Sequence, residues 1–168
     1  MIAQPKLYSL PYTQMQTYVA ASLFVIGNIL LPQLFHLMPD GGKIWLPIYF
    51  FTLVGAYKYG WRVGLLTAVA SPLINSWLFG MPAAAVLPAI LLKSVLLAIA
   101  AGVVSARSGK VTLLTTALVV LIYQVIGALG EWALTSSLDV ALQDMRIALP
   151  GIALQIFGAT AVLRLWRK

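Results

Sequence analysis

The sequence contains no cysteine and only one histidine, His36, and these two shortages exclude several kinds of site. Without cysteine the chain can form no disulfide, no thiol nucleophile and no thiolate metal site. One histidine and four acidic residues in the whole chain offer little material for a metal centre or a catalytic set. We therefore expect no metal, no cofactor and no enzymatic activity.

A phosphate-binding loop is also missing from the sequence. Such a loop needs a glycine, four further residues and then Gly-Lys followed by serine or threonine. The two Gly-Lys pairs, which begin at Gly42 and Gly109, are followed by isoleucine and valine. The chain is therefore not expected to hydrolyse ATP by itself.

Charged residues are scarce, at 9% of the chain, whereas hydrophobic residues make up 61%. Soluble domains contain about a quarter charged and roughly half apolar residues. This balance predicts a single integral membrane domain over residues 1–168. The net charge of +7 does not indicate nucleic-acid binding, because the cationic residues stand at the ends of apolar runs and not in one patch.

Six apolar runs predict an all-α fold, an integral membrane bundle of six transmembrane helices. The second run has only fourteen residues, which is about 21 Å of helix against a hydrocarbon core of about 30 Å. It can span only if Trp45 at one interface and Lys58 at the other extend it. Residues 38–43 and 135–146 are expected to be loops. The predicted helices are about residues 15–37, 44–57, 60–79, 86–106, 112–134 and 147–163.

Cationic residues are divided unequally between the two sides of this six-span arrangement. Eight fall on the side of the termini and two on the other side, while Lys93 lies within a span. Positive residues concentrate on the cytoplasmic side of membrane proteins, so both termini are expected to face the cytoplasm from a bacterial-type cytoplasmic membrane. The eight are Lys6, Lys58, Arg62, Arg107, Lys110, Arg164, Arg167 and Lys168, and the two are Lys43 and Arg146.

Polar residues within the predicted spans collect in the half of the membrane opposite the termini. On the fifth helix Gln124 and Glu131 share a face with Gly127 and Ala128. A face of small residues with one or two polar groups is typical of a cavity wall. We predict a substrate-binding site that opens to the outer face and is formed by Asn28, Trp45, Asn75, Lys93, Gln124, Glu131 and Gln155.

Lys93 and Glu131 are charges at membrane depth, and a charge there costs about 2.5–3.5 kcal/mol on insertion scales. The two residues could form an ion pair that joins the fourth helix to the fifth. One or both could instead contact a ligand that enters from outside. Each could also extend toward the outer interface. The sequence leaves these three interpretations open.

Small residues recur at every fourth position of the third apolar run, at Gly60, Gly64 and Ala68. Residues at this spacing share one face of a helix. In lipid such a face lets a second helix approach closely. We predict that these three residues serve helix packing or docking.

Several short motifs occur in a fixed order between Gly41 and Gly102. Trp-Leu-Pro in the second run is followed by Lys-Tyr-Gly-Trp-Arg-Val-Gly from Lys58, then by Ser-Pro and by Phe-Gly-Met-Pro. With the six-span layout, this order resembles the substrate-binding S component of energy-coupling factor (ECF) vitamin transporters. The resemblance implies a membrane protein that captures a vitamin or related micronutrient at its outer face. It also implies as partners a membrane coupling subunit and two cytoplasmic ATPase subunits.

The resemblance has two further implications for named segments. In the resembling family, the loop between the first two helices closes over the substrate, and here that gating loop contains Asp40, Gly41 and Gly42. The first helix of that family usually carries a ladder of small residues for docking, but residues 20–27 do not form one. This departure leaves two alternatives open: a different coupling subunit, or docking through the face of Gly60, Gly64 and Ala68.

A structural membrane protein of the cell-shape (MreD-like) type is the alternative, because such proteins have a similar size and number of spans. A scaffold predicts polar groups at the helix ends around an apolar interior. The positions of Lys93, Glu131 and Gln155 within the spans favour transport instead. Charges of both signs, together with tryptophans near the predicted outer surface, would fit a small ring compound with a charged group.

Overall fold

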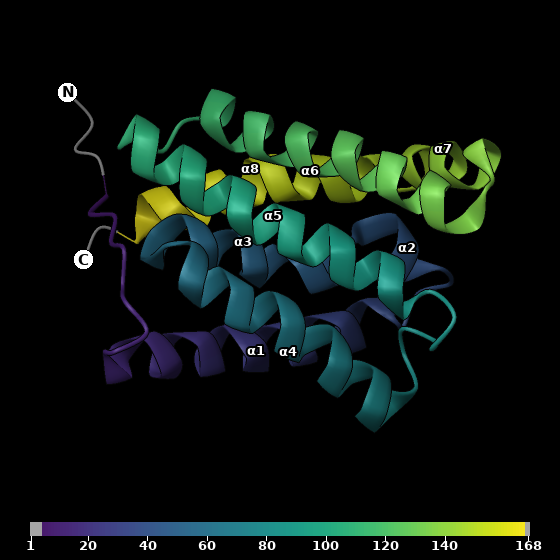
Figure 1. Ribbon diagram of the computed structural model, residues 1–168, viewed down its shortest axis with the longest axis horizontal. Helices are drawn as coiled ribbons and strands as arrows, with labels where there is room; N and C mark the ends of the chain where they lie inside the picture. Colours follow the sequence, from purple (N-terminus) through teal and green to yellow (C-terminus); the bar gives the residue numbers. More distant parts are fainter. Residues whose placement is uncertain (1–4, 167–168) are drawn as a thin grey trace.

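The computed structural model describes residues 5–166, except for the side chains of Val140 and Asp144. This part of the chain forms eight helices and no strand. Six helices run lengthwise beside one another as a bundle, and the short α2 and α7 lie at one end of it (Figure 1). The helices are α1 (Met15–Phe35), α2 (Gly41–Trp45), α3 (Pro47–Tyr59), α4 (Trp61–Phe79), α5 (Leu87–Ser108), α6 (Leu113–Thr135), α7 (Leu138–Ile147) and α8 (Leu149–Leu165).

The two ends of the bundle differ in the segments that they contain. Residues 5–12, the α3–α4 and α5–α6 junctions and Trp166 lie at one end, which we call the terminal end (Figure 1). We call the opposite end the α2–α7 end. The six long helices match the six predicted ones to within three residues at each boundary.

Proline and glycine set many of these helix boundaries. Pro47, Pro88 and Pro150 stand in the first turns of α3, α5 and α8, where a missing N–H costs no intrahelical hydrogen bond. Gly80 and Gly109 end α4 and α5 in the left-handed conformation, with φ of 66° and 59°. These breaks divide the apolar sequence into separate helices.

Two segments that were predicted to be loops contain helices. Gly41 and Gly42 do not lie in a loop but form the first turn of α2. The predicted loop over residues 135–146 contains most of α7. The loop was predicted from the polar residues of this segment. Its apolar residues Leu138, Ala141 and Met145 recur at helical spacing, and Ala141 is buried in the structure. Ala141 therefore packs α7 against the bundle, while Leu138 at the start of α7 is 51% exposed.

Three of the described helices, α1, α5 and α6, are long and apolar enough to cross a membrane. A fourth span results if α7 and α8, which meet at a bend, are counted together. α3 has 13 residues and α8 has 17, which is fewer than the roughly 20 that a hydrocarbon core of about 30 Å requires.

Large apolar side chains cover the outside of the bundle. On α1, for example, Leu23, Leu30 and Leu34 are each more than 60% exposed. Soluble monomers rarely expose contiguous apolar patches beyond a few hundred Å². An outer surface of this kind, on helices that are long and apolar enough to span, suits contact with lipid.

Small residues bring α3, α4 and α5 close together. A Cβ on Gly64 would lie 2.4 Å from Cβ of Ala56 on α3 and 3.1 Å from Cβ of Ala98 on α5. Ala68 is fully buried, and Gly60 is a buried junction residue with φ of 95° that joins α3 to α4. These three residues therefore pack inside the chain and present no free face to an outside helix.

An arm without regular secondary structure, residues 5–12, crosses the terminal end (Figure 1). The N–H of Tyr8 donates to the carbonyl of Lys58 at 2.8 Å, and the N–H of Leu10 donates to the carbonyl of Tyr59 at 3.0 Å. Both carbonyls belong to the last turn of α3, where no further helical N–H is available. The arm therefore completes the hydrogen bonding of this helix end.

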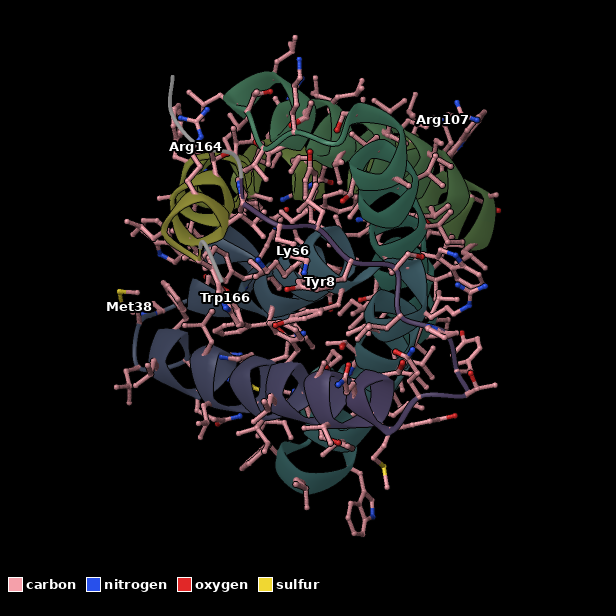
Figure 2. All side chains as sticks on the ribbon, turned by 90° about the vertical axis from the view of Figure 1, so that its left-hand side faces the viewer. Lys6, Tyr8, Met38, Arg107, Arg164 and Trp166 are labelled. Carbon is pink, nitrogen blue, oxygen red and sulfur yellow. The ribbon has the colours of Figure 1, made fainter. Side chains whose placement is uncertain are left out.

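The described cationic residues gather at the terminal end, apart from Lys43 in α2, Arg146 in α7 and Lys93 within α5. Figure 2 looks onto the terminal end and shows Lys6 near its centre and Arg107 and Arg164 toward its rim. Arg167 and Lys168 lie outside the described residues. Within residues 5–166, the division of charge predicted from the sequence therefore coincides with the two ends of the bundle.

Candidate functional site

A first group of buried polar side chains joins α1, α3 and α4, and Asn28 is its centre. Asn28 Nδ2 donates to Thr52 Oγ1 at 2.9 Å and to Ser71 Oγ at 3.2 Å. Its Oδ1 accepts the N–H of Phe51 at 3.1 Å. The side chain is fully buried, and both of its polar atoms are engaged within the chain. We call Asn28, Thr52, Ser71 and Asn75 the asparagine cluster.

Asn75 joins the same cluster from the second half of α4. Its Nδ2 donates to the carbonyls of Asn28, at 3.0 Å, and Ser71, at 2.9 Å. Its Oδ1 has no hydrogen-bond partner among the described residues. The asparagine cluster therefore holds three helices together, and Oδ1 of Asn75 is the one amide atom in it without a partner.

A second group connects α6 to α8. Gln124 Nε2 donates to the hydroxyl oxygen of Tyr123 at 3.1 Å, and that hydroxyl donates to Gln155 Oε1 at 2.8 Å. Tyr123 and Gln155 are fully buried, and Gln124 is 5% exposed. We call these three residues the tyrosine–glutamine chain. Gln155 Nε2 has no hydrogen-bond partner in the described part of the protein.

Lys93 and Glu131 form an ion pair between α5 and α6, through Nζ and Oε2. Their side chains are 12% and 8% exposed. The aliphatic stem of Lys93 lies over Gly127, where an added Cβ would come within 2.7 Å of Lys93 Cγ. The small-residue face that resembled a cavity wall in the sequence is thus occupied by the lysine. Three interpretations of these charges were left open by the sequence. The structure shows the first of them, an ion pair between Lys93 and Glu131.

Trp45 occupies the α2–α7 end, where its ring lies 5.6 Å from that of Phe35 and its main chain abuts α8. A Cβ on Gly151 would lie 2.6 Å from the Trp45 carbonyl oxygen. The residues on either side of α2, Asp40 and Leu46, both adopt the left-handed conformation, with φ of 52° and 49°. α2 is therefore a separate five-residue helix between two conformational breaks.

Four of the seven predicted site residues fall into two groups with α3 between them, whereas Lys93 and Glu131 pair with each other and Trp45 lies at the α2–α7 end. Asn28 and Asn75 belong to the asparagine cluster, whereas Gln124 and Gln155 belong to the tyrosine–glutamine chain. The sequence placed all of them around one cavity, because residues at equal depth were assumed to face one another. The depth of a residue along a helix does not tell which neighbouring helix its side chain faces. Here α1 and α4 lie on one side of α3, and α6 and α8 lie on the other (Figure 1).

Two polar residues of this region were missed in the sequence. Tyr123 lies in an apolar run and was read as part of it, although its hydroxyl connects the two glutamines. Ser94 follows Lys93 and is fully buried, and its Oγ has no hydrogen-bond partner among the described residues. Its position beside a charged residue within a span is the signal that could have singled it out.

No three His, Asp or Glu side chains come together as a metal site within the described residues. The chemistry that residues 5–166 offer here is hydrogen bonding from amides and hydroxyls, beside the Lys93–Glu131 ion pair. The chain matches no known protein-family model, no curated protein and no solved structure. The geometry of these side chains is therefore the evidence on function.

Proposed function

We propose that the chain is a membrane-embedded substrate-capture subunit, similar to the S component of ECF transporters, that binds a vitamin or related micronutrient. The observation that carries this proposal is a set of buried polar atoms without partners toward the α2–α7 end. Gln155 Nε2 and Ser94 Oγ belong to this set. An unpaired buried polar group costs about 1–3 kcal/mol, so a ligand that pairs with these atoms would gain free energy.

The orientation follows from the division of charge between the ends of the bundle. Six helices cross the membrane in this proposal, with α3 and α8 extended by their flanking residues. The basic terminal end faces the cytoplasm and the α2–α7 end faces outward. The unpaired polar atoms then lie nearer the side from which a micronutrient arrives.

Partners are part of the proposal, because the sequence carries no phosphate-binding loop of its own. A membrane coupling subunit and two cytoplasmic ATPase subunits would supply the energy for uptake. Gly64 packs against α3 and α5 and Ala68 is fully buried, so the coupling subunit would have to dock on another face than theirs.

Equilibrium binding to the purified full chain tests the proposal. The probes are radiolabelled riboflavin, biotin, nicotinamide, pantothenate, thiamine and pyridoxine, each with an excess of unlabelled compound as control. Saturable binding of one compound is the expected result. Binding of none would contradict the proposed function.

The cell-shape scaffold is the second candidate, and two contacts favour it. Asn28 is fully engaged by neighbouring helices, and Lys93 is paired with Glu131. Both contacts are what a rigid structural bundle would use. A scaffold would bind none of the six compounds.

A further inference from the structure

An apolar groove with a volume of about 430 Å³ lies between α1 and α4, which run side by side (Figure 1). One wall is the stretch of α1 from Tyr18 to Ile29, and the other is the stretch of α4 from Leu66 to Ile74. Apart from the hydroxyl groups of Tyr18 and Ser22, the side chains that line the groove are hydrocarbon. The groove therefore offers almost no hydrogen bonds and suits an apolar occupant.

The groove is open to the surroundings of the bundle. Tyr18 and Ile26 in its α1 wall are 46% and 52% exposed. Val69 and Leu73, which are neighbours of the α4 wall in the sequence, are 42% and 44% exposed. Because α1 is long and apolar enough to cross a membrane, the groove would face lipid tails there.

The length of the groove matches one leaflet of a bilayer. Tyr18 and Ile29 are eleven residues apart on α1, which is about 16 Å of helix. Half of a hydrocarbon core of about 30 Å is about 15 Å. Beside Ile29 and Ile74 the two walls are joined, because Asn75 Nδ2 donates to the carbonyl of Asn28 at 3.0 Å. The groove therefore has the length of one acyl chain.

A cation stands at the terminal end of the groove. Arg62 precedes Leu66 by one helical turn, so the two residues share a face of α4. The guanidinium carbon of Arg62 lies 4.7 Å from the ring centroid of Trp61 and 5.8 Å from that of Tyr12. Within residues 5–166, Arg62 forms no salt bridge. Its charge is thus not neutralised by a carboxylate of the described chain.

We propose that one acyl chain of an anionic phospholipid occupies this groove and that the lipid phosphate binds Arg62. A guanidinium group matches phosphate oxygens with two parallel hydrogen bonds. The phosphate then lies at the terminal end, and the acyl chain extends along α1 from Tyr18 toward Ile29. A helix of another protein would contact the same apolar lining, but the cation at one end and the length of one leaflet favour a phospholipid. The inference does not depend on which substrate the chain captures.

Native mass spectrometry of the purified full chain tests the headgroup contact. The probes are phosphatidylglycerol and phosphatidylcholine with the same two acyl chains, each added in detergent. The chain should retain phosphatidylglycerol about fivefold more strongly, and Arg62→Gln should abolish this preference. The matched control is Arg107→Gln, which removes an exposed cation of α5 at the same end and should keep the preference. Equal retention of both lipids by the unaltered chain, or a preference that survives Arg62→Gln, would overturn the inference.

Two variants that fill the groove test the acyl-chain contact. Ala70→Phe fills it from α4 and Ser22→Phe fills it from α1, whereas Val69→Phe adds the same ring beside the groove as a matched control. Retention of phosphatidylglycerol should fall about tenfold in the first two, which is the loss of about two buried methylene groups, and should not change in the control. Melting temperatures identify any variant that fails to fold.

Two results with the groove-filling variants would contradict the proposed lipid. Unchanged retention in a folded Ala70→Phe or Ser22→Phe protein would show that the acyl chain does not lie in the groove. The same spectra report the oligomeric state of the chain. A dimer that dissociates in Ala70→Phe while lipid retention stays unchanged would assign the groove to a second copy of the chain and overturn the inference.

Discussion

The ammonium group of Lys58 donates a hydrogen bond of 2.9 Å to the main-chain carbonyl of Trp166 and so ties the end of α3 to the end of α8. The Lys58 side chain is fully buried, and its nitrogen lies 5.6 and 5.9 Å from the ring centroids of Tyr8 and Trp166. Two aromatic faces and a carbonyl compensate for part of the hydration that the ammonium loses. This contact joins the N-terminal arm, α3 and α8 at the terminal end, where Figure 2 shows Tyr8 and Trp166.

Trp166→Ala is expected to destabilise the terminal end. The ring packs against Phe24 and Tyr59, at 6.0 and 5.9 Å between centroids, and covers the Lys58 ammonium. Each aromatic pair contributes about 0.5–1.5 kcal/mol, so the melting temperature should fall measurably. Trp77→Ala is the matched control, because Trp77 is 83% exposed. Equal melting temperatures for the two variants would contradict the role given to Trp166.

Both termini are expected to be cytoplasmic. The basic terminal end provides the reason, since positive residues near the ends of spans are retained inside. A reporter fused after the last residue should read as cytoplasmic, and one inserted after Asp40, before α2, should read as external. In the six-span arrangement five spans separate the two positions, so they must lie on opposite sides of the membrane. If both reporters gave the same reading, this arrangement would be refuted.

Lys93 and Glu131 are expected to depend on each other for stability. Removing one partner of a buried pair leaves the other charge without its partner and costs about 3–5 kcal/mol. Lys93→Met and Glu131→Gln should each lower the melting temperature, and the double variant should recover most of the loss. Ligand affinity measured on the same three proteins tests whether Lys93 also contacts the ligand. Unchanged affinity in Lys93→Met would exclude such a contact.

The helices of the bundle could be predicted from the sequence, because proline, glycine and apolar run length act locally. Gly80, for example, follows the end of α4 where the sequence predicted it, whereas α3 begins at Pro47, three residues after the predicted start at residue 44. The six-span topology built on those helices stays a prediction. Depth was also readable, since Gln155 and Glu131 lie toward the α2–α7 end as their positions in the runs indicate.

Direction around each helix could not be predicted from the same patterns. These helices expose apolar side chains outward and bury polar ones inward, so an apolar stripe does not identify the core face as it does in water. Asn28 and Gln155 therefore seemed to share a cavity, although α3 stands between their clusters. The role of Tyr123 depends on a contact between α6 and α8 that no local pattern encodes.

α2 is expected to change its protection from solvent when ligand binds. Asp40 and Leu46 on either side of it hold positive φ, a conformation that costs non-glycine residues about 1 kcal/mol or more. These two residues separate α2 from the longer helices α1 and α3 along the chain. Hydrogen exchange over residues 38–46 should slow when the purified chain is saturated with the compound that it binds. Exchange that does not change in this segment on saturation would count against α2 as the gate.

Gly151→Ala is expected to disturb the α2–α7 end. Its added methyl group would lie 2.6 Å from the carbonyl carbon and oxygen of Trp45 and 2.7 Å from the carbonyl oxygen of Ile44. These atoms belong to the main chain, so α2 must move away from α8, and overpacking of this kind costs about 1–3 kcal/mol. Gly158→Ala is the matched control on the same helix, because its new contact, at 3.1 Å, is with the movable ring of Phe50. The melting temperature should fall more for Gly151→Ala, and hydrogen exchange over residues 41–46 should rise in that variant alone. A loss of equal size in both variants would show that the close contact between α8 and α2 adds no stability.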